Sequence, residues 1–198
     1  KKATNFLVSS RLNVFDAMPY PYGFGVNEKS EFDMTEPAWL IGELYKAGVR
    51  ILNITMGNPY FNPHINRPFA NGAYEPDEHP LTGVKRVLSG TEELKKAVPE
   101  MKLICSAVTF LGVAAPNVTA AYIEKGAFDF AGFGRTILAY PDFANDILKN
   151  GGMDKNKCCL CCSKCTEIMR KPGGTPGCVI RDSEVYLPIY QKLCGGKK

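Results

Sequence analysis

This 198-residue sequence lacks the features that mark several large classes of protein. It has no apolar run approaching the ~20 residues that cross a bilayer, and Lys1 to Thr4 lead into no signal-like apolar stretch. It also has no block of lysines and arginines, although 24 basic and 20 acidic residues give a net charge of +4. We therefore expect a cytosolic protein that binds neither membranes nor nucleic acids.

Two further absences concern dinucleotides and disulfides. The chain has no Gly-x-Gly-x-x-Gly fingerprint of a dinucleotide-binding unit. Its first 150 residues hold a single cysteine, Cys105, whereas a secreted disulfide scaffold spreads cysteines through a small, core-poor chain. With 45% hydrophobic residues, the chain can instead bury an ordinary core. Because it begins with Lys1 and almost at once with a strand-like run, we expect further sequence upstream.

Strand-like and helix-like segments alternate through residues 1–150. Strands are expected at 5–14, 50–56, 101–108 and 128–133, and helices after them at 37–47, 91–97, 117–125 and 142–149. We expect Thr35 to cap the first helix and Gly48 to end it. Such alternation predicts a parallel sheet and the α/β class, because right-handed crossovers return the chain in one direction. Four βα units fit either an open doubly wound sheet or half of an eight-stranded barrel.

The alternation stops after residue 150, and a segment rich in cysteine, glycine, proline and lysine begins. We expect residues 151–198 to form a loop-rich lobe organised by its ligands, with a frayed tail at 195–198. Six of the eight cysteines lie in this lobe within one short stretch, namely Cys158, Cys159, Cys161, Cys162, Cys165 and Cys178. Of the other two, Cys105 is expected to be a small buried hydrophobe and Cys194 a tail thiol.

Two spacings of the clustered cysteines could hold an iron–sulfur cluster. C-x2-C-x2-C-x12-C uses Cys159, Cys162, Cys165 and Cys178, whereas C-x2-C-x3-C-x12-C uses Cys158, Cys161 and the same last two. Either spacing lets three thiolates of a tight loop bind one side of a cubane cluster, while a fourth thiolate, distant in sequence, completes the ligand set. A structural zinc site usually takes its thiolates from two C-x2-C pairs. The grouping of three plus one thus favours a 4Fe-4S cluster over zinc, and disulfides or unligated thiols are a third alternative.

The run GAFDFAGFGRTILAYPD at 126–142, followed by the cysteine lobe, resembles the Old Yellow Enzyme family of flavin reductases. The closer resemblance is to its iron–sulfur branch, which includes 2,4-dienoyl-CoA reductase, enoate reductases and trimethylamine dehydrogenase. It extends from about Phe6 to Arg181 and implies that the four βα units are the fifth to eighth of a (β/α)8 TIM barrel. It also implies FMN and one 4Fe-4S cluster as cofactors, with Cys159, Cys162, Cys165 and Cys178 as ligands.

The resemblance further implies the residues that hold the flavin. Gly134 and Arg135, after the last strand, match the family's contact to the flavin phosphate. Ala107 and Val108 match its second backbone contact, although this sequence lacks the Gly-rich turn that many relatives have there. Arg11 matches the strand arginine that faces the flavin pyrimidine ring, where a fixed cation stabilises the anionic reduced flavin.

A loop at 57–68, after the second strand, is expected to overhang the active-site face. In the dienoyl-CoA reductase branch a histidine of this loop supports the substrate carbonyl or donates a proton. The spacing differs here, so Tyr60 and His64 are both candidate proton donors. The alternative is a loop stiffened by prolines, with its polar groups satisfied locally.

The expected reaction is reduction of an activated C=C bond in an enoate- or dienoyl-type substrate. Hydride passes from NADH or NADPH through FMN to the β-carbon, and an acid protonates the α-carbon. The cluster would relay electrons to or from an FAD-containing domain or a partner protein, and we expect a homo-oligomer. Two alternatives stay open, namely an amine dehydrogenase, which would need an aromatic cage, and a truncated cluster-binding module without its own activity.

Overall fold

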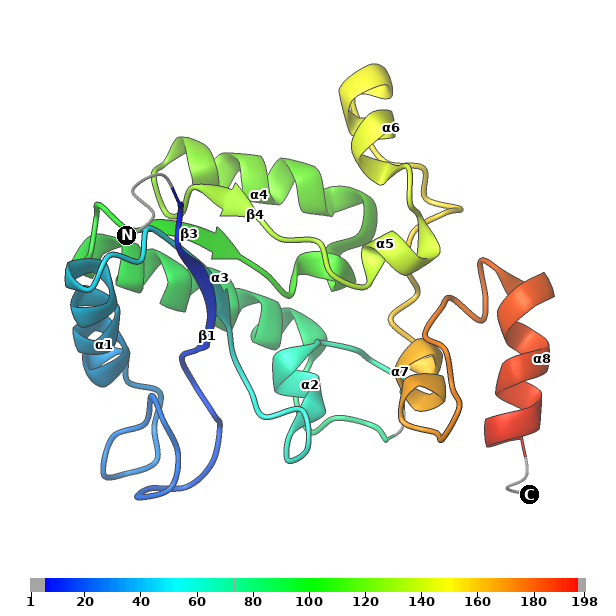
Figure 1. Ribbon diagram of the computed structural model, residues 1–198, viewed down its shortest axis with the longest axis horizontal. Helices are drawn as coiled ribbons and strands as arrows, with labels where there is room; N and C mark the ends of the chain where they lie inside the picture. Colours follow the sequence, from blue (N-terminus) through cyan, green and yellow to red (C-terminus); the bar gives the residue numbers. More distant parts are fainter. Residues whose placement is uncertain (1–5, 73, 196–198) are drawn as a thin grey trace.

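The computed structural model describes residues 6–72 and 74–195 (Figure 1). Most of the expected tail, 196–198, lies outside the described residues. The strands are β1 (Ser9–Asn13), β2 (Ile51–Thr55), β3 (Lys102–Cys105) and β4 (Phe130–Ala131). The helices are α1 (Thr35–Lys46), α2 (Pro63–Asn66), α3 (Pro80–Ala97), the 3-10 helix η1 (Val108–Ala114), α4 (Ala115–Glu124), α5 (Thr136–Ala139), α6 (Phe143–Asn150), α7 (Lys164–Met169) and α8 (Ser183–Cys194). The structure confirms the α/β class.

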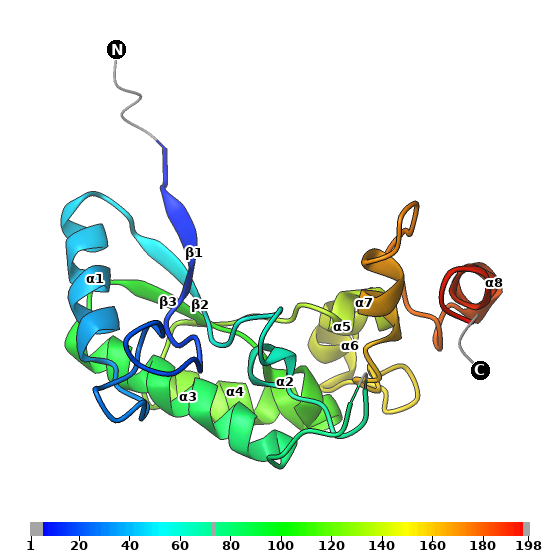
Figure 2. The same ribbon diagram turned by 90° about the horizontal axis from the view of Figure 1, so that it is seen from below.

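The four strands form one parallel sheet in the order β1-β2-β3-β4. Right-handed crossovers that each advance by one strand in the same direction place their helices on the same face. In agreement with this, α1 packs against α3, and Figure 2 shows α3 and α4 along one side of the sheet. A doubly wound sheet reverses its strand order and carries helices on both faces. This sheet is therefore singly wound.

Burial alternates along the strands, as expected where only one face of a sheet is covered. Leu52, Ile54, Leu103 and Cys105 point towards the helices and are fully buried. Burying such side chains contributes about 1.5–3 kcal/mol each. The other face carries the row Arg11, Asn53, Ile104 and Phe130, which the strand register places side by side. None of these four is buried, so this open face is where the expected flavin arginine lies.

The carboxyl ends of parallel strands meet at one edge of a sheet. The arrows of β3 and β4 point towards the segment that carries α7 and α8, which lies beyond this edge (Figure 1). We call residues 151–195 the cysteine lobe. The side chain of Arg170 in this lobe donates a hydrogen bond to the carbonyl of Pro59, which follows β2, at 2.9 Å. The fold thus brings the cysteine lobe to the edge at which the expected flavin and substrate residues lie.

Several elements differ from the sequence prediction. Helix α3 begins at Pro80 rather than near residue 91. Two glycines inside it, Gly83 and Gly90, resemble helix breakers in sequence but lie at close contacts. A Cβ on Gly90 would lie 2.5 Å from the Met56 side chain and 2.8 Å from that of Phe32. The glycine therefore permits close packing, and the helix continues through it.

The prediction that Thr35 caps the first helix is wrong, since the N-cap is Met34. The amide of Thr35 donates to the carboxylate of Asp33 at 2.8 Å, which satisfies one free donor of the first turn. Gly48 follows the helix with a positive φ of 105°, in agreement with its expected role as the stop.

The lobe that was expected to be rich in loops also contains two helices, α7 and α8. Helix α8 has 12 residues and contains Pro188, a residue that usually interrupts helices. It packs against α7, where the Tyr190 hydroxyl donates to Glu167 at 2.7 Å. None of the helices in residues 6–72 and 74–195 is long and apolar enough to cross a membrane.

Candidate functional site

Four cysteines line a single cavity of about 370 Å³, a volume that includes the open space at its mouth. They are Cys159, Cys162, Cys165 and Cys178. We call this space the cysteine cavity. Cys158 and Cys161, from the same loop, are buried and do not line it. The lining of the cavity thus contains all four cysteines of the C-x2-C-x2-C-x12-C spacing and leaves out Cys158 and Cys161.

Two residues in the left-handed region of backbone space shape this loop. Cys161 has a φ of 54° and Ser163 a φ of 62°. Each costs about 1–2 kcal/mol for a residue with a side chain, so the surrounding structure must hold them. Ser163 lines the cavity and its buried Oγ has no hydrogen-bond partner within the described residues. An unsatisfied hydroxyl beside four thiols indicates a site that is completed by a polar or charged ligand.

Two of the cavity thiols accept backbone hydrogen bonds. The amide of Cys161 donates to Cys159 Sγ at 3.4 Å, and the amide of Arg181 donates to Cys178 Sγ at 3.3 Å. Hydrogen bonding by the Cys161 thiol and amide, together with the charges of Arg135 and Arg181, lowers the pKa of Cys159 to about 6 despite its burial. Since the thiolate is the form that ligates metals, the site favours the ligand-competent state of Cys159.

Positively charged arginines lie in the lining of the cavity and near it. Arg135 lines it, and its buried Nη1 has no hydrogen-bond partner in the described part of the chain. Arg67, in the loop after α2, likewise has a buried Nε without a partner. Burial and the charges of Arg135 and Arg170 lower the pKa of Arg67, whereas a thiolate at Cys165 would raise it. Arg67 therefore lies within electrostatic reach of the cavity, although it belongs to a different part of the chain.

Within the described residues, no three histidine, cysteine, aspartate or glutamate side chains converge closely enough to hold one metal ion. Both the 4Fe-4S cluster and the zinc alternative stay predictions for the four cysteines.

Comparison with family models, with curated proteins and with solved structures finds no match to this chain. The family resemblance therefore stays a prediction from the residues quoted above. What the structure adds is the placement of those residues.

The expected phosphate contacts lie together at the carboxyl ends of β3 and β4. Ala107 adopts a left-handed φ of 67°, the conformation for which glycine is the usual residue, and Val108 after it is buried. The hydroxyl of Thr136 donates to Thr109 at 3.3 Å and joins the segment after β4 to η1. A Cβ on Gly134 would meet no atom within 4 Å, so the backbone there is open to a ligand.

Arg11 lies exposed on the open face of the sheet, opposite Asn53 in the strand register. The hydroxyl of Ser106, just after β3, donates to the Asn53 side chain at 2.8 Å and orders this polar face. Among the five expected flavin residues, Arg11 has its side chain on the open face of the sheet. Arg135 is the one of the five that lines the cysteine cavity.

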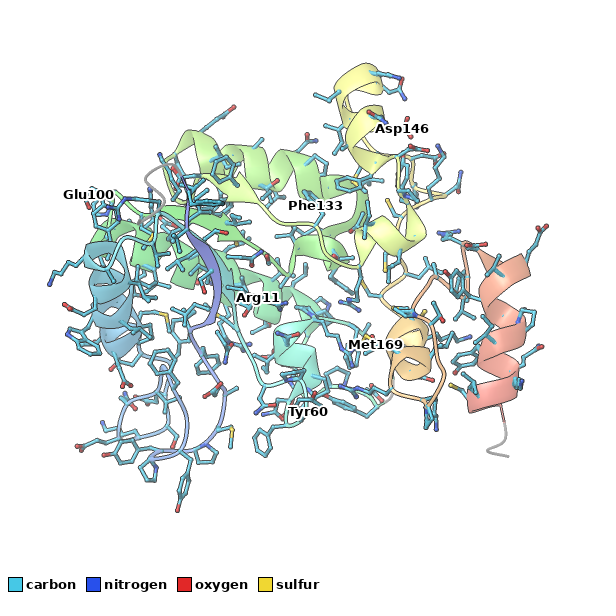
Figure 3. All side chains as sticks on the ribbon, in the orientation of Figure 1. Arg11, Tyr60, Glu100, Phe133, Asp146 and Met169 are labelled. Atoms are coloured by element: carbon cyan, nitrogen blue, oxygen red, sulfur yellow. The ribbon has the colours of Figure 1, made fainter. Side chains whose placement is uncertain are left out.

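The two candidate proton donors are not brought together. Tyr60 is 89% exposed at the outer part of its loop (Figure 3). His64 is only 7% exposed, with its Nδ1 2.7 Å from the Tyr74 hydroxyl and its Nε2 3.4 Å from Asp77. The imidazole of His64 thus has local partners on both nitrogens. Its role as a proton donor stays a prediction, and the structure shows it in the arrangement of a structural histidine.

Sequence reasoning missed Arg67, Arg181 and Ser163 as parts of the site. Ser163 and Arg181 lie next to predicted ligands in sequence, so their proximity to the cysteines offered a signal. Arg67 offered none, because a lone arginine in a proline-rich loop carries no spacing that predicts electrostatic interaction with a distant lobe.

Proposed function

We propose that this chain is the C-terminal half of a (β/α)8 barrel of the Old Yellow Enzyme type, followed by an iron–sulfur lobe. The intact protein reduces activated C=C bonds of α,β-unsaturated substrates with NAD(P)H, FMN and one 4Fe-4S cluster. The cysteine cavity carries the proposal, because four thiols with a cluster-type spacing line it and the two neighbouring cysteines do not.

The sheet supports the barrel part of the proposal. A barrel is a singly wound sheet whose helices all lie outside, and whose other face becomes the interior. The order β1-β2-β3-β4 is that of a singly wound sheet. Strands β1 and β4 are its two edges, at which other strands would close the barrel. The polar row around Arg11 and Asn53 would then face the interior near the flavin.

The residues at the carboxyl edge fit an FMN phosphate and a cluster side by side. Gly134 and the backbone at Ala107 would approach the phosphate, with the guanidinium of Arg135 between it and the cysteine cavity. Arg11 would stabilise negative charge on the reduced flavin. When bound, the cluster supplies transfer of single electrons. Tyr60 is exposed enough to deliver a proton to a substrate held over this edge.

A second candidate function is an electron-transfer module that binds a cluster but no flavin. The observation that favours it is that the four cysteines lie within one lobe, whereas the flavin face is bounded by two unpaired sheet edges. The cluster could therefore assemble on this chain while flavin binding needs further strands.

Anaerobic purification followed by iron, acid-labile sulfide, zinc and flavin analysis tests the proposal. We expect about four iron and four sulfide per chain, with FMN retained when the upstream half of the barrel is present. Zinc without sulfide would contradict the cluster. Cluster without flavin in the intact protein would leave the electron-transfer module as the function.

A further inference from the structure

Two arginines line the cysteine cavity, and a third, Arg67, lies within electrostatic reach of it. Arg135 follows β4 and Arg181 belongs to the lobe, and both line the cavity. Arg67 comes from the loop after α2. None of the three forms an ion pair with a carboxylate among residues 6–72 and 74–195.

Two guanidinium nitrogens near the cavity are buried without a partner among the described residues. Arg135 Nη1 and Arg67 Nε are both withdrawn from solvent and make no hydrogen bond in the described part of the chain. A buried polar atom without a partner costs about 1–3 kcal/mol, so such nitrogens normally have an acceptor beside them. Arg135 and Arg181 line the same cavity as the four thiols, which are therefore their candidate anions, and a thiolate at Cys165 would also act electrostatically on Arg67.

A cluster held by four thiolates carries net negative charge and becomes more negative when it is reduced. Nearby positive charge therefore stabilises the reduced form more than the oxidised one, and net charge around a cluster is one of the determinants of its reduction potential.

Resting on the cluster proposed above, we propose that Arg67, Arg135 and Arg181 are the counter-charges of the cluster and raise its reduction potential. Arg67 is the informative member, because it is neither in the lobe nor among the expected flavin contacts. Through it, a loop of the barrel half tunes a centre that is held by another segment.

Arg170 supports this role for the loop. Its guanidinium donates to the carbonyl of Pro59 at 2.9 Å and lies 5.8 Å from the centre of the Tyr60 ring. These contacts hold the lobe against the loop before α2. Arg67 follows α2 directly, so the same contacts keep its part of the chain close to the lobe.

The test is the midpoint potential of the cluster, followed by EPR in a redox titration of the anaerobically purified protein. Arg67→Gln removes the charge, Arg67→Lys retains it, and Arg50→Gln removes an equal charge. Arg50 lies directly before β2, at the amino-terminal ends of the strands and thus away from the cysteine cavity. Its guanidinium donates to the backbone carbonyls of Tyr45 and Val49. Iron and sulfide content is measured for every variant.

We expect full cluster content in all variants, a more negative midpoint for Arg67→Gln, and midpoints close to that of the unaltered protein for Arg67→Lys and Arg50→Gln. Equal shifts in Arg67→Gln and Arg67→Lys would overturn the inference, because packing and not charge would then be responsible. An unchanged midpoint with loss of flavin would also overturn it and assign Arg67 to the flavin phosphate.

Arg181→Gln provides a second measurement if Arg67→Gln does not fold. Arg181 is exposed, so its replacement is tolerated more readily, and we expect a negative shift of the midpoint here too. No shift in this variant would contradict the inference. If the unaltered protein contains no iron and sulfide, the proposed function fails before this inference is reached, and the two failures are thus distinguished.

Discussion

Single residues determine which cysteines face the cavity. The left-handed conformations of Cys161 and Ser163 turn the chain twice within three residues, and the thiols of Cys159 and Cys162 face the cavity while that of Cys161 does not. The spacing of the cysteines was visible in the sequence, and it left two sets of ligands open. The backbone conformation that distinguishes the sets was not visible, because neither residue is a glycine or an asparagine that would indicate a positive φ.

Serine substitutions test the ligand set. We expect Cys159→Ser and Cys162→Ser to abolish cluster assembly, because a hydroxyl replaces a thiolate that lines the cavity. Cys158→Ser and Cys161→Ser are the matched controls in the same loop and should retain iron and sulfide. Iron and sulfide analysis with the absorption spectrum gives the result. Cluster loss in the control pair and retention in the first pair would select the other spacing.

Asp129 is a single residue whose ionisation contributes to the pH dependence of stability. Its carboxylate accepts hydrogen bonds from Lys102 Nζ at 2.8 Å and the Leu103 amide at 3.0 Å, and Lys95 Nζ lies 2.9 Å away. Burial alone would raise the pKa of Asp129, but these donors outweigh it and hold the pKa below its ordinary value. A lowered folded-state pKa stabilises the fold above the unfolded value of about 4, and this contribution is lost as the pH falls through the folded-state pKa.

We therefore expect Asp129→Asn to lower the free energy of unfolding by about 1–3 kcal/mol at pH 7, with a smaller difference near pH 3. Urea unfolding at several pH values measures this. Glu100→Gln is the control, since Glu100 is exposed and forms no ion pair within the described residues (Figure 3). A destabilisation that does not change with pH would show that Asp129 acts through packing and not through its charge.

Among the elements, strands were predicted more closely than helices. The four strand positions follow from β-branched and apolar runs such as Ile51 to Thr55, and all four lie within the expected ranges. Helix α3 was predicted too short because local propensity counts glycine as unfavourable. The contacts of Gly90 with Met56 and Phe32 are long-range, so only the folded structure shows why glycine is suited to that position.

Two glycines give opposite predictions for the same substitution. Gly42 lies inside α1 with ordinary helical geometry, and a Cβ there would meet no atom within 4 Å. Gly42→Ala should therefore stabilise the protein by about 0.5–1 kcal/mol. Gly57, after β2, has a φ of 84°, and a Cβ there would lie 2.6 Å from the Asn66 amide nitrogen.

Gly57→Ala should accordingly destabilise by more than about 1 kcal/mol, since both the backbone and the contact oppose it. It should also disturb the loop that carries Tyr60. Thermal unfolding of the two variants beside the unaltered protein measures the difference. Equal effects of the two substitutions would indicate that the loop after β2 adjusts freely, and would weaken its assignment as a fixed part of the site.

At the scale of the molecule, the sheet has one covered and one open face and ends at β1 and β4. The sequence predicted strand-helix alternation, and it left open whether the sheet is doubly wound or part of a barrel. Strand order distinguishes these, and order depends on contacts between segments that are distant in sequence. The order shows a singly wound sheet with β1 and β4 at its edges, and the barrel half stays a proposal.

An open edge strand with apolar residues beside it favours association with other chains. Leu7, two residues before the start of β1, is 65% exposed. We expect the 198-residue chain alone to self-associate with rising concentration, and Leu7→Lys to reduce this, because a buried lysine would oppose strand pairing. Light scattering during size-exclusion chromatography measures it. Leu148→Lys is the matched control, since Leu148 is 84% exposed on α6, away from the edge, and an equal effect of both variants would show that general apolar exposure, not the β1 edge, causes the association.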